Sequence, residues 1–522
     1  MFTCLNLNDM LSYFYKLQEV AVMDNTQKLK QLYKILDEIE AYDRSVGKLN
    51  FDLECCAPEE GMEKAGEDMA ILSKHIHSLL HSKKYTTLVC ELFDNSEGLT
   101  DVQKKLIEHL YDDYAKTKNI SAKLSYEMDI ARNKAYGEWL KAKKQDDFSI
   151  FRDSFEKVVN YTKKAIDLRD RKYASYYDAC LDDYEKGGSI EQLDGFFSAL
   201  KERIVPLLKK IQASDKKIRD DFMKRPCPVY KQEAFSKRLL EIEGLRKTAL
   251  VLMTTEHPFT TNFGPQDVRV TTHYYEENFI SNVFSTLHEG GHALFMQNEP
   301  EELYENHADN AMSNAMHECI SRFYENIVGR SEEFIHYIYP ELLKVSGGVF
   351  DDITERELYE AINIAEPGFI RMEADELTYS LHILIRYELE KAFINGEITV
   401  DEVPALWKAK YKEYLGLDVP SDTLGCLQDM HWTMDYGYFP SYALGNAYGA
   451  QILNTMKKDF DVYCAIREGK LDKLLAWLKE NVFSIASLTT PDEWINKITG
   501  ESLNVNYYLD YLEEKFTKLY EL

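Results

Sequence analysis

Two histidines four residues apart, with a glutamate directly after the first, stand at His288, Glu289 and His292 in the run ENFISNVFSTLHEGGHALFMQN. On a helix, residues four apart lie on one face, so both imidazoles can reach a single metal ion. The carboxylate beside them is placed to take a proton from an attacking water molecule. The pattern predicts a zinc site of hydrolytic type, and the alternative is a helix that carries two ordinary histidines.

Catalytic zinc normally has three protein ligands, so a third donor is needed. The downstream H-x-x-G-x-x-H arrangement is absent, because its glycine position holds Phe295 and its last histidine position holds Asn298. Glu318, in NAMHECISRFYENIVGR, shares a predicted helix face with Arg322, and an acid on an apolar face usually has a partner there. We expect Glu318 to be the third ligand. The alternative is an ion pair between Glu318 and Arg322, one turn later.

The elements that must position these side chains are mostly helical. Apolar residues recur at spacings of three and four, as in TQKLKQLYKILDEIEAY. Residues 257–275 differ, because the alternating run DVRVTTHYY follows a proline and a glycine, which predicts a short hairpin or edge strand. We therefore expect a mainly α fold with a small β element beside the metal helix. Gly290 and Gly291 indicate that a substrate or a neighbouring helix approaches that helix closely.

Composition narrows the classes of function. The 522 residues, 45% of them hydrophobic, suffice for a large core, which we expect to form one helical peptidase unit. Within it we expect an N-terminal lobe at 1–250, a catalytic core at 251–450 and C-terminal helices at 451–522. A formal net charge of -27 argues against binding to nucleic acid.

The sequence also bears on location. No stretch reaches the roughly 18 apolar residues that a membrane span needs. The first twenty residues, MFTCLNLNDMLSYFYKLQEV, lack the pattern of a secretory signal. Nine scattered cysteines are typical of reduced thiols. We expect a cytoplasmic protein without a membrane partner.

Several separated motifs resemble one known family, the carboxypeptidase Taq metallopeptidases. They occur in the family's order: HPF at 257–259, DVRVT at 267–271, HEGGH at 288–292, HE at 317–318, IRMEAD at 370–375, GCLQDMHW at 425–432 and GYFPSYALGN at 437–446. The resemblance implies a metal-dependent carboxypeptidase with two helical lobes around a deep groove, usually a homodimer. It also implies His288, His292 and Glu318 as ligands and Glu289 as the catalytic carboxylate. HECISR departs from the family's H-E-S-Q-S-R at Cys319 and Ile320.

A carboxypeptidase must recognise a free carboxylate, and the arginine fork does so with two parallel hydrogen bonds. Arg371 in IRMEAD is the first candidate, and the resemblance points the same way; Arg269 in DVRVT is the second. Each arginine fits equally a structural ion pair, for which Glu373 and Asp375 are the expected partners of Arg371.

Hydrolysis also needs a donor for the developing oxyanion. His431 and Tyr438 are candidates, because both lie in the dense aromatic and polar run QDMHWTMDYGYFPSY. Each fits a packed core position as well. His257, before Pro258, is expected to line the groove or to donate a hydrogen bond to the substrate.

These observations predict a zinc carboxypeptidase that releases single amino acids from peptides with a free C-terminal carboxylate. Co²⁺ or Mn²⁺ can occupy the same ligands. One alternative is a helical zinc oligopeptidase or dipeptidyl carboxypeptidase, which would share the metal site. A second alternative, of another class, is a non-catalytic helical scaffold with a relic metal site.

Overall fold

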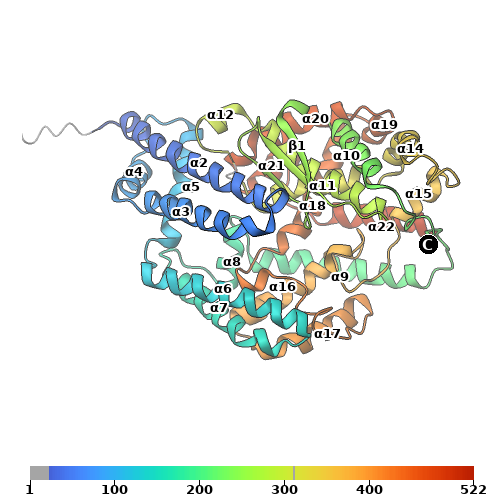
Figure 1. Cartoon of the computed structure of the whole chain (residues 1–522), viewed down its shortest axis with the longest axis horizontal. Coiled ribbons are helices and arrows are strands. Elements are labelled where there is room, and N and C mark those ends of the chain that lie inside the picture. Colours follow the sequence, from blue (N-terminus) through green and yellow to red (C-terminus); the bar gives the residue numbers. More distant parts are fainter. Residues whose placement is uncertain (1–22, 310–311) are drawn as a thin grey trace, which may run out of the picture. The chain divides into compact units, whose positions relative to one another are not determined.

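The structure is a computed structural model that describes residues 23–309 and 312–522 (Figure 1). In this part of the chain there are twenty-one α-helices and one three-stranded sheet, which confirms the predicted mainly α fold. The N-terminal run without a secretory pattern, residues 1–20, lies outside the described residues. Among the helices of the described ranges, none has the length and apolar character needed to cross a bilayer.

The chain forms two compact units. Among the described residues, the first comprises 23–114 together with 305–308, and the second comprises 115–304, 309 and 312–522. Within the first unit, α2 packs on α3 and α4 around buried leucines such as Leu32 and Leu92. Its helices are α2 (Asn25–Cys55), α3 (Met62–Leu80), α4 (Lys83–Asp94) and most of α5 (Asp101–Thr117). The predicted boundaries at residues 250 and 450 stay a prediction.

The second unit holds the site residues and one large apolar core. Its α-helices up to the metal helix are α6 (Ala122–Gln145), α7 (Ser149–Asp167), α8 (Tyr176–Tyr184), α9 (Ile190–Gln212), α10 (Val229–Glu243) and α11 (Phe279–Asn298). The later ones are α12 (Glu301–Glu305), α13 (Asn314–Arg322), α14 (Glu332–Ser346), α15 (Glu355–Ile362), α16 (Tyr379–Asn395), α17 (Val403–Leu415), α18 (Pro440–Asp459), α19 (Val462–Arg467), α20 (Leu471–Asn481), α21 (Pro491–Thr499) and α22 (Asn506–Tyr520).

The small β element predicted at 257–275 is present and packs on α11. β2 (Thr260–Asn262) pairs antiparallel with β3 (Val268–Thr272), with Thr260 opposite Val270. A further strand, β1 (Leu250–Thr254), pairs parallel with β3, so the strand order is β1-β3-β2. Val268 and Val270 are fully buried, whereas Arg269 between them is half-buried, as the alternation of a strand requires. This sheet forms a platform beside the metal helix.

Three helices of the second unit meet at the site. Asn278 caps α11 by accepting the backbone N–H of Ser281, and Ser313 caps α13 by accepting that of Met316. α13 packs against both α11 and α18. A short π-helix at Phe323–Val328 continues directly from α13. Together these elements bring single residues that lie between positions 288 and 442 of the sequence to the same pocket.

Glycines allow α11 to approach its neighbours closely. A Cβ atom at Gly290 would lie 1.9 Å from Oε2 of Glu243 on α10, and one at Gly291 would lie 2.7 Å from Cα of Ser321 on α13. A Cβ at Gly445 of α18 would lie 2.9 Å from Cγ of Glu318. The two glycines of the HEGGH motif therefore serve the packing of neighbouring helices against the metal helix.

Candidate metal centre

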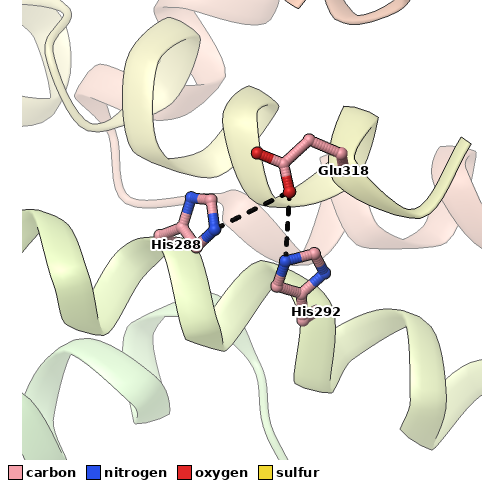
Figure 2. A group of neighbouring side chains, drawn as sticks. All are labelled: His288, His292 and Glu318. Atoms are coloured by element: carbon pink, nitrogen blue, oxygen red, sulfur yellow. Dashed lines mark ion pairs between the residues drawn. The ribbon is translucent and has the colours of Figure 1, made fainter. Parts of the chain in front are cut away.

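His288 and His292 project from one face of α11 toward Glu318 of α13 (Figure 2). Nε2 of His288 lies 3.8 Å from Oε2 of Glu318, and Nε2 of His292 lies 3.4 Å from the same oxygen. The three donor atoms lie within 4.8 Å of one another, so the group can hold one metal ion. Two imidazole nitrogens and one carboxylate oxygen form a donor set that zinc accepts. The structure thus brings together the three residues predicted as ligands.

Glu318 uses its second carboxylate oxygen differently. Its Oε1 accepts a hydrogen bond of 2.7 Å from Nε of Arg322. Burial raises the pKa of Glu318, but the charges of Arg322 and His288 outweigh burial, so the pKa lies well below its usual range. Glu318 is therefore ionised, which is the form that ligates a metal.

His288 has a carboxylate partner on its other ring nitrogen. Nδ1 of His288 lies 2.9 Å from Oε2 of Glu325, which also accepts a 2.9 Å hydrogen bond from Nη1 of Arg322. Burial raises the pKa of Glu325, yet the Arg322 guanidinium outweighs burial and the pKa falls to about 2. An ionised Glu325 can only accept a hydrogen bond, so Nδ1 of His288 donates.

His292 instead has an imidazole partner. Its Nδ1 lies 2.6 Å from Nδ1 of His317. Burial and the neighbouring His292 lower the pKa of His317 to about 3, so His317 is neutral. A neutral imidazole can accept at Nδ1 when its proton is on Nε2. Among the described residues, that Nε2 atom has no hydrogen-bond partner.

Glu289 lies beside the ligands in a pocket of about 550 Å³. Its carboxylate Oε2 lies 2.6 Å from Oγ1 of Thr260, and the same hydroxyl lies 3.0 Å from the backbone oxygen of Glu289. The side chain of Glu289 is 7% exposed. β2 thus fixes a nearly buried carboxylate next to the three donor atoms.

Another part of the pocket wall comes from the start of α18 and the loop before it. Tyr438 and Tyr442 line the pocket, with ring centres 5.2 Å apart. Burial raises the pKa of Tyr438, so its phenol keeps its proton and can donate it in a hydrogen bond. His431 packs at 5.5 Å from the Tyr438 ring but is not among the described residues that line the pocket. Burial lowers the pKa of His431 to about 4.

Arg371 is buried behind this wall. Its Nη2 lies 2.8 Å from Oδ1 of Asp429, and its Nη1 donates to the Tyr379 hydroxyl at 3.2 Å. The guanidinium carbon lies 5.0 Å from the ring centre of Tyr442. Arg371 therefore contacts the pocket wall through an aromatic ring.

The predicted partners of Arg371, Glu373 and Asp375, were wrong. Its hydrogen bonds go to Asp429 and Tyr379, 58 and 8 residues away along the chain. Asp375 is occupied elsewhere, because its Oδ1 accepts the backbone N–H groups at the residues before α16. The carboxylate nearest in sequence has this local capping role, so a distant one pairs with the arginine.

The remaining predicted substrate contacts lie around the sheet. Arg269 on β3 pairs with Asp267 at 2.9 Å and lies 4.8 Å from the ring centre of Phe263. His257 is exposed, and its backbone oxygen accepts a 2.9 Å hydrogen bond from Thr255. The next residues along the chain, Pro258 and Phe259, line the pocket.

Sequence reasoning missed four residues that surround the site: Glu325, His317, Thr260 and Tyr442. One of them had a detectable signal. Glu325 stands seven residues after Glu318, with Arg322 between them, and that spacing places all three on one helix face. His317, Thr260 and Tyr442 had none, because their contacts depend on how α13, the sheet and α18 pack on α11.

The fold and the site together define a class: a mostly helical metallopeptidase with two histidines on one helix, α11, and an acid on a second helix, α13. The family model for "Carboxypeptidase Taq (M32) metallopeptidase" matches residues 31–516. The chain belongs to this family, and it is accordingly a metal-dependent carboxypeptidase.

Individual relatives agree over nearly the full length. Carboxypeptidase 1 of Bacillus subtilis is 38% identical over 499 residues, which are 94% of this chain and 99% of the relative. Thermostable carboxypeptidase 1 of Thermus thermophilus is 34% identical, over 92% of this chain and 96% of the relative. The solved structure of Trypanosoma cruzi metallocarboxypeptidase 1 matches with a TM-score of 0.90 at 30% identity, over 94% of this chain and 99% of that one.

Proposed function

We propose that this enzyme removes single amino acids from the carboxyl ends of peptides, with zinc held by His288, His292 and Glu318. The observation that carries the proposal is the convergence of three donor atoms within 4.8 Å, next to a carboxylate in the same pocket. When bound, the ion supplies Lewis-acid chemistry at the scissile carbonyl. Co²⁺ and Mn²⁺ are proposed substitutes, because the same donor types bind them.

Glu289 is the proposed general base. It lies in the pocket, and the Thr260 hydroxyl 2.6 Å from Oε2 limits the orientations of its carboxylate. It accepts a proton from the attacking water and passes that proton to the leaving amine. Glu289 thereby acts as a base when water attacks and as an acid when the amine leaves.

Tyr438 is the first proposed donor to the developing oxyanion, since its protonated phenol lines the pocket. His431 is the second, and it packs behind the Tyr438 ring. Arg371 is proposed to recognise the terminal carboxylate of the peptide from its position behind Tyr442. Arg269 and His257 are proposed as further substrate contacts near the sheet.

A digest of a mixed peptide library, followed by mass spectrometry, tests the reaction. Stepwise loss of one residue at a time from the carboxyl end is the expected result. Internal fragments, or release of dipeptides, would instead identify a helical oligopeptidase or dipeptidyl carboxypeptidase with the same metal site. Peptides with an amidated carboxyl end serve as the control, and we expect them to resist digestion.

Metal analysis of the purified protein tests the cofactor. We expect about one zinc per chain, loss of activity on chelation and recovery when zinc, cobalt or manganese is restored. A chain that contains no stoichiometric metal and regains no activity with any of the three ions would be a relic of the family.

We further propose a homodimer that works in the cytoplasm. The family resemblance supports the dimer, and nine scattered cysteines, a pattern typical of reduced thiols, support the compartment. Sedimentation of the purified chain at micromolar concentration tests the dimer. A single species at the monomer mass of 60.8 kDa would contradict it.

A further inference from the structure

The π-helix that follows α13 brings a second acid to the metal centre. α13 ends at Arg322 and the π-helix runs from Phe323 to Val328, with Glu325 in its first turn. The π-helix and α11 are in close contact, because a Cβ atom at Gly329 would lie 2.6 Å from Cδ1 of Leu287, the residue before His288. Single π-turns within helices are rare and frequently occur at functional sites.

We propose that Glu325 is a positioning residue that fixes the ring orientation and the tautomer of His288 for metal binding. This inference rests on the proposed metal site. His288 turns Nε2 toward Oε2 of Glu318, at 3.8 Å, and Nδ1 toward Oε2 of Glu325, at 2.9 Å. A neutral imidazole has one donor nitrogen and one acceptor nitrogen. Oε2 of Glu325 already accepts a hydrogen bond from Nη1 of Arg322 at 2.9 Å, so this oxygen is an acceptor toward His288 as well. Nδ1 of His288 therefore carries the proton, and the lone pair of Nε2 faces the metal position.

Arg322 joins this positioning residue to the acidic ligand. Its Nε donates to Oε1 of Glu318 at 2.7 Å, and its Nη1 donates to Oε2 of Glu325 at 2.9 Å. Its Nη2 donates to the hydroxyl of Tyr379 at 2.9 Å. The side chain of Arg322 is 12% exposed and is not among the described residues that line the pocket. Its hydrogen bonds to both acids restrain the positions of Glu318 and Glu325 relative to each other. Oε2 of Glu318 is thereby left to face both imidazoles.

The two histidine ligands differ in how firmly they are held. His292 has an imidazole, His317, as the partner of its Nδ1, whereas His288 has a carboxylate. An imidazole can either donate or accept, so His317 selects the tautomer of His292 only through its own tautomer. The carboxylate of Glu325 can only accept, so it selects the tautomer of His288 in which Nδ1 carries the proton. His288 is therefore the ligand with the fixed tautomer, and Glu325 is the reason.

The test is the metal affinity of the full-length protein, measured by competition with a chromogenic chelator. We expect Glu325→Ala to weaken zinc binding by about 10–100-fold. Glu325→Gln is expected to fall between that variant and the wild type, because its amide oxygen still accepts a hydrogen bond but carries no charge. Glu376→Gln is the matched control, since Glu376 is a buried acid paired with Lys515 in the same unit. Its zinc affinity is expected to match that of the wild type.

A second measurement separates positioning from general damage to the fold. The absorption spectrum of the cobalt-substituted protein reports the ligand geometry, and we expect a shift in the two Glu325 variants but not in Glu376→Gln. Unchanged zinc affinity and an unchanged cobalt spectrum in Glu325→Ala would overturn the proposal. If Glu325→Ala does not fold, Glu325→Gln decides by the same criteria.

The proposed function can fail independently of this inference. A wild-type protein that binds zinc but releases no amino acids would contradict the peptidase proposal and leave the role of Glu325 intact. Variants with both the metal affinity and the cobalt spectrum of the wild type would contradict the role of Glu325, whatever the peptide digest shows.

Discussion

The two oxygens of the Glu318 carboxylate have different neighbours. The sequence left two interpretations of this residue open, a third metal ligand or an ion-pair partner of Arg322, and both interpretations are compatible. Oε2 faces both imidazoles and Oε1 accepts from Arg322, so the position expected of a third ligand and the ion pair occur together. A carboxylate has enough lone pairs for both partners. The ion pair is therefore no argument against ligation, because it orients the oxygen that remains.

We expect Glu289→Gln to lower kcat by at least about 100-fold, because it removes a general base. Its metal content should equal that of the wild type, since the amide has the same shape and the three ligands are untouched. Steady-state kinetics and metal analysis of one preparation provide the check. Glu301→Gln, at an exposed acid on α12, is the control and should have wild-type activity. Turnover close to that of the wild type in metal-loaded Glu289→Gln would remove this residue from proton transfer.

Arg371→Ala is expected to lower kcat/KM on peptides with a free carboxylate by about 30-fold or more, the cost of truncating a buried charge pair. Peptides with an amidated carboxyl end are expected to be cleaved slowly by both proteins, and their kcat/KM should change little in the variant. Asp429 keeps Arg386 as a partner at 2.6 Å, so the variant should remain folded, as a thermal melt can verify. Equal losses on both kinds of peptide would mean that Arg371 acts through structure alone.

Local spacing explains which site residues could be predicted. His288, Glu289 and His292 depend only on helical periodicity, so the sequence alone brings them together. Glu325 and Thr260 contact residues 37 and 29 positions away, through the π-helix and β2. No pattern in the sequence encodes how those elements pack on α11. The pairing of Arg371 with Asp429 escaped prediction for the same reason.

At the scale of elements, the hairpin could be expected and its parallel neighbour could not. Residues 260–272 alternate and contain turn residues, which predict β2 and β3. β1 directly follows a short helical stretch and pairs with β3, from which β2 separates it in the sequence. Its sequence, LVLMT, is a short apolar run that fits a helix end as well as a strand. A short apolar run of this kind can be identified as a strand only when the strand it pairs with is known.

The contact between α11 and α13 has no room for a methyl group at Gly291. A Cβ there would lie 2.7 Å from both the backbone oxygen of Ile320 and Cα of Ser321, and backbone atoms cannot rotate away. We expect Gly291→Ala to cost about 1–3 kcal/mol in the free energy of unfolding. Because it pushes the histidine pair away from Glu318, zinc affinity should fall as well. Urea denaturation and chelator competition measure the two effects.

Gly137→Ala is the matched control for that substitution. Gly137 lies inside α6, and a Cβ there would meet nothing within 4 Å. It should stabilise the protein by about 0.4–1 kcal/mol, as alanine does at a helical position without strain. Equal effects of the two substitutions would show that the close approach at Gly291 is unimportant.

At the scale of the whole molecule, buried acids make stability depend on pH. Burial raises the pKa of Glu185 from 4.5 to about 7, which outweighs its hydrogen bonds to Ser441 and to the backbone of Ala315. Between pH 4.5 and 7 the folded chain keeps a proton there that the unfolded chain has lost. Stability therefore falls as the pH rises through this window.

Glu185→Gln should remove that fall, because an amide does not titrate. At pH 8 the variant is expected to be more stable than the wild type by on the order of 3 kcal/mol. Below about pH 4.5 the two proteins should be alike. Urea unfolding at several pH values checks the difference, with the exposed Glu191→Gln as a control. A constant offset between Glu185→Gln and the wild type at every pH would contradict the titration.

The short segment 305–308 belongs to the first unit although the chain on either side belongs to the second. Asn306 accepts a hydrogen bond from Tyr33 at 2.8 Å, and His307 pairs with Glu40. The polypeptide consequently passes from one unit to the other at three points along the sequence, after residues 114, 304 and 308. A protein consisting of residues 115–522 alone would contain residues 305–308 without their partners Tyr33 and Glu40. These residues lie shortly before α13, the helix that carries Glu318.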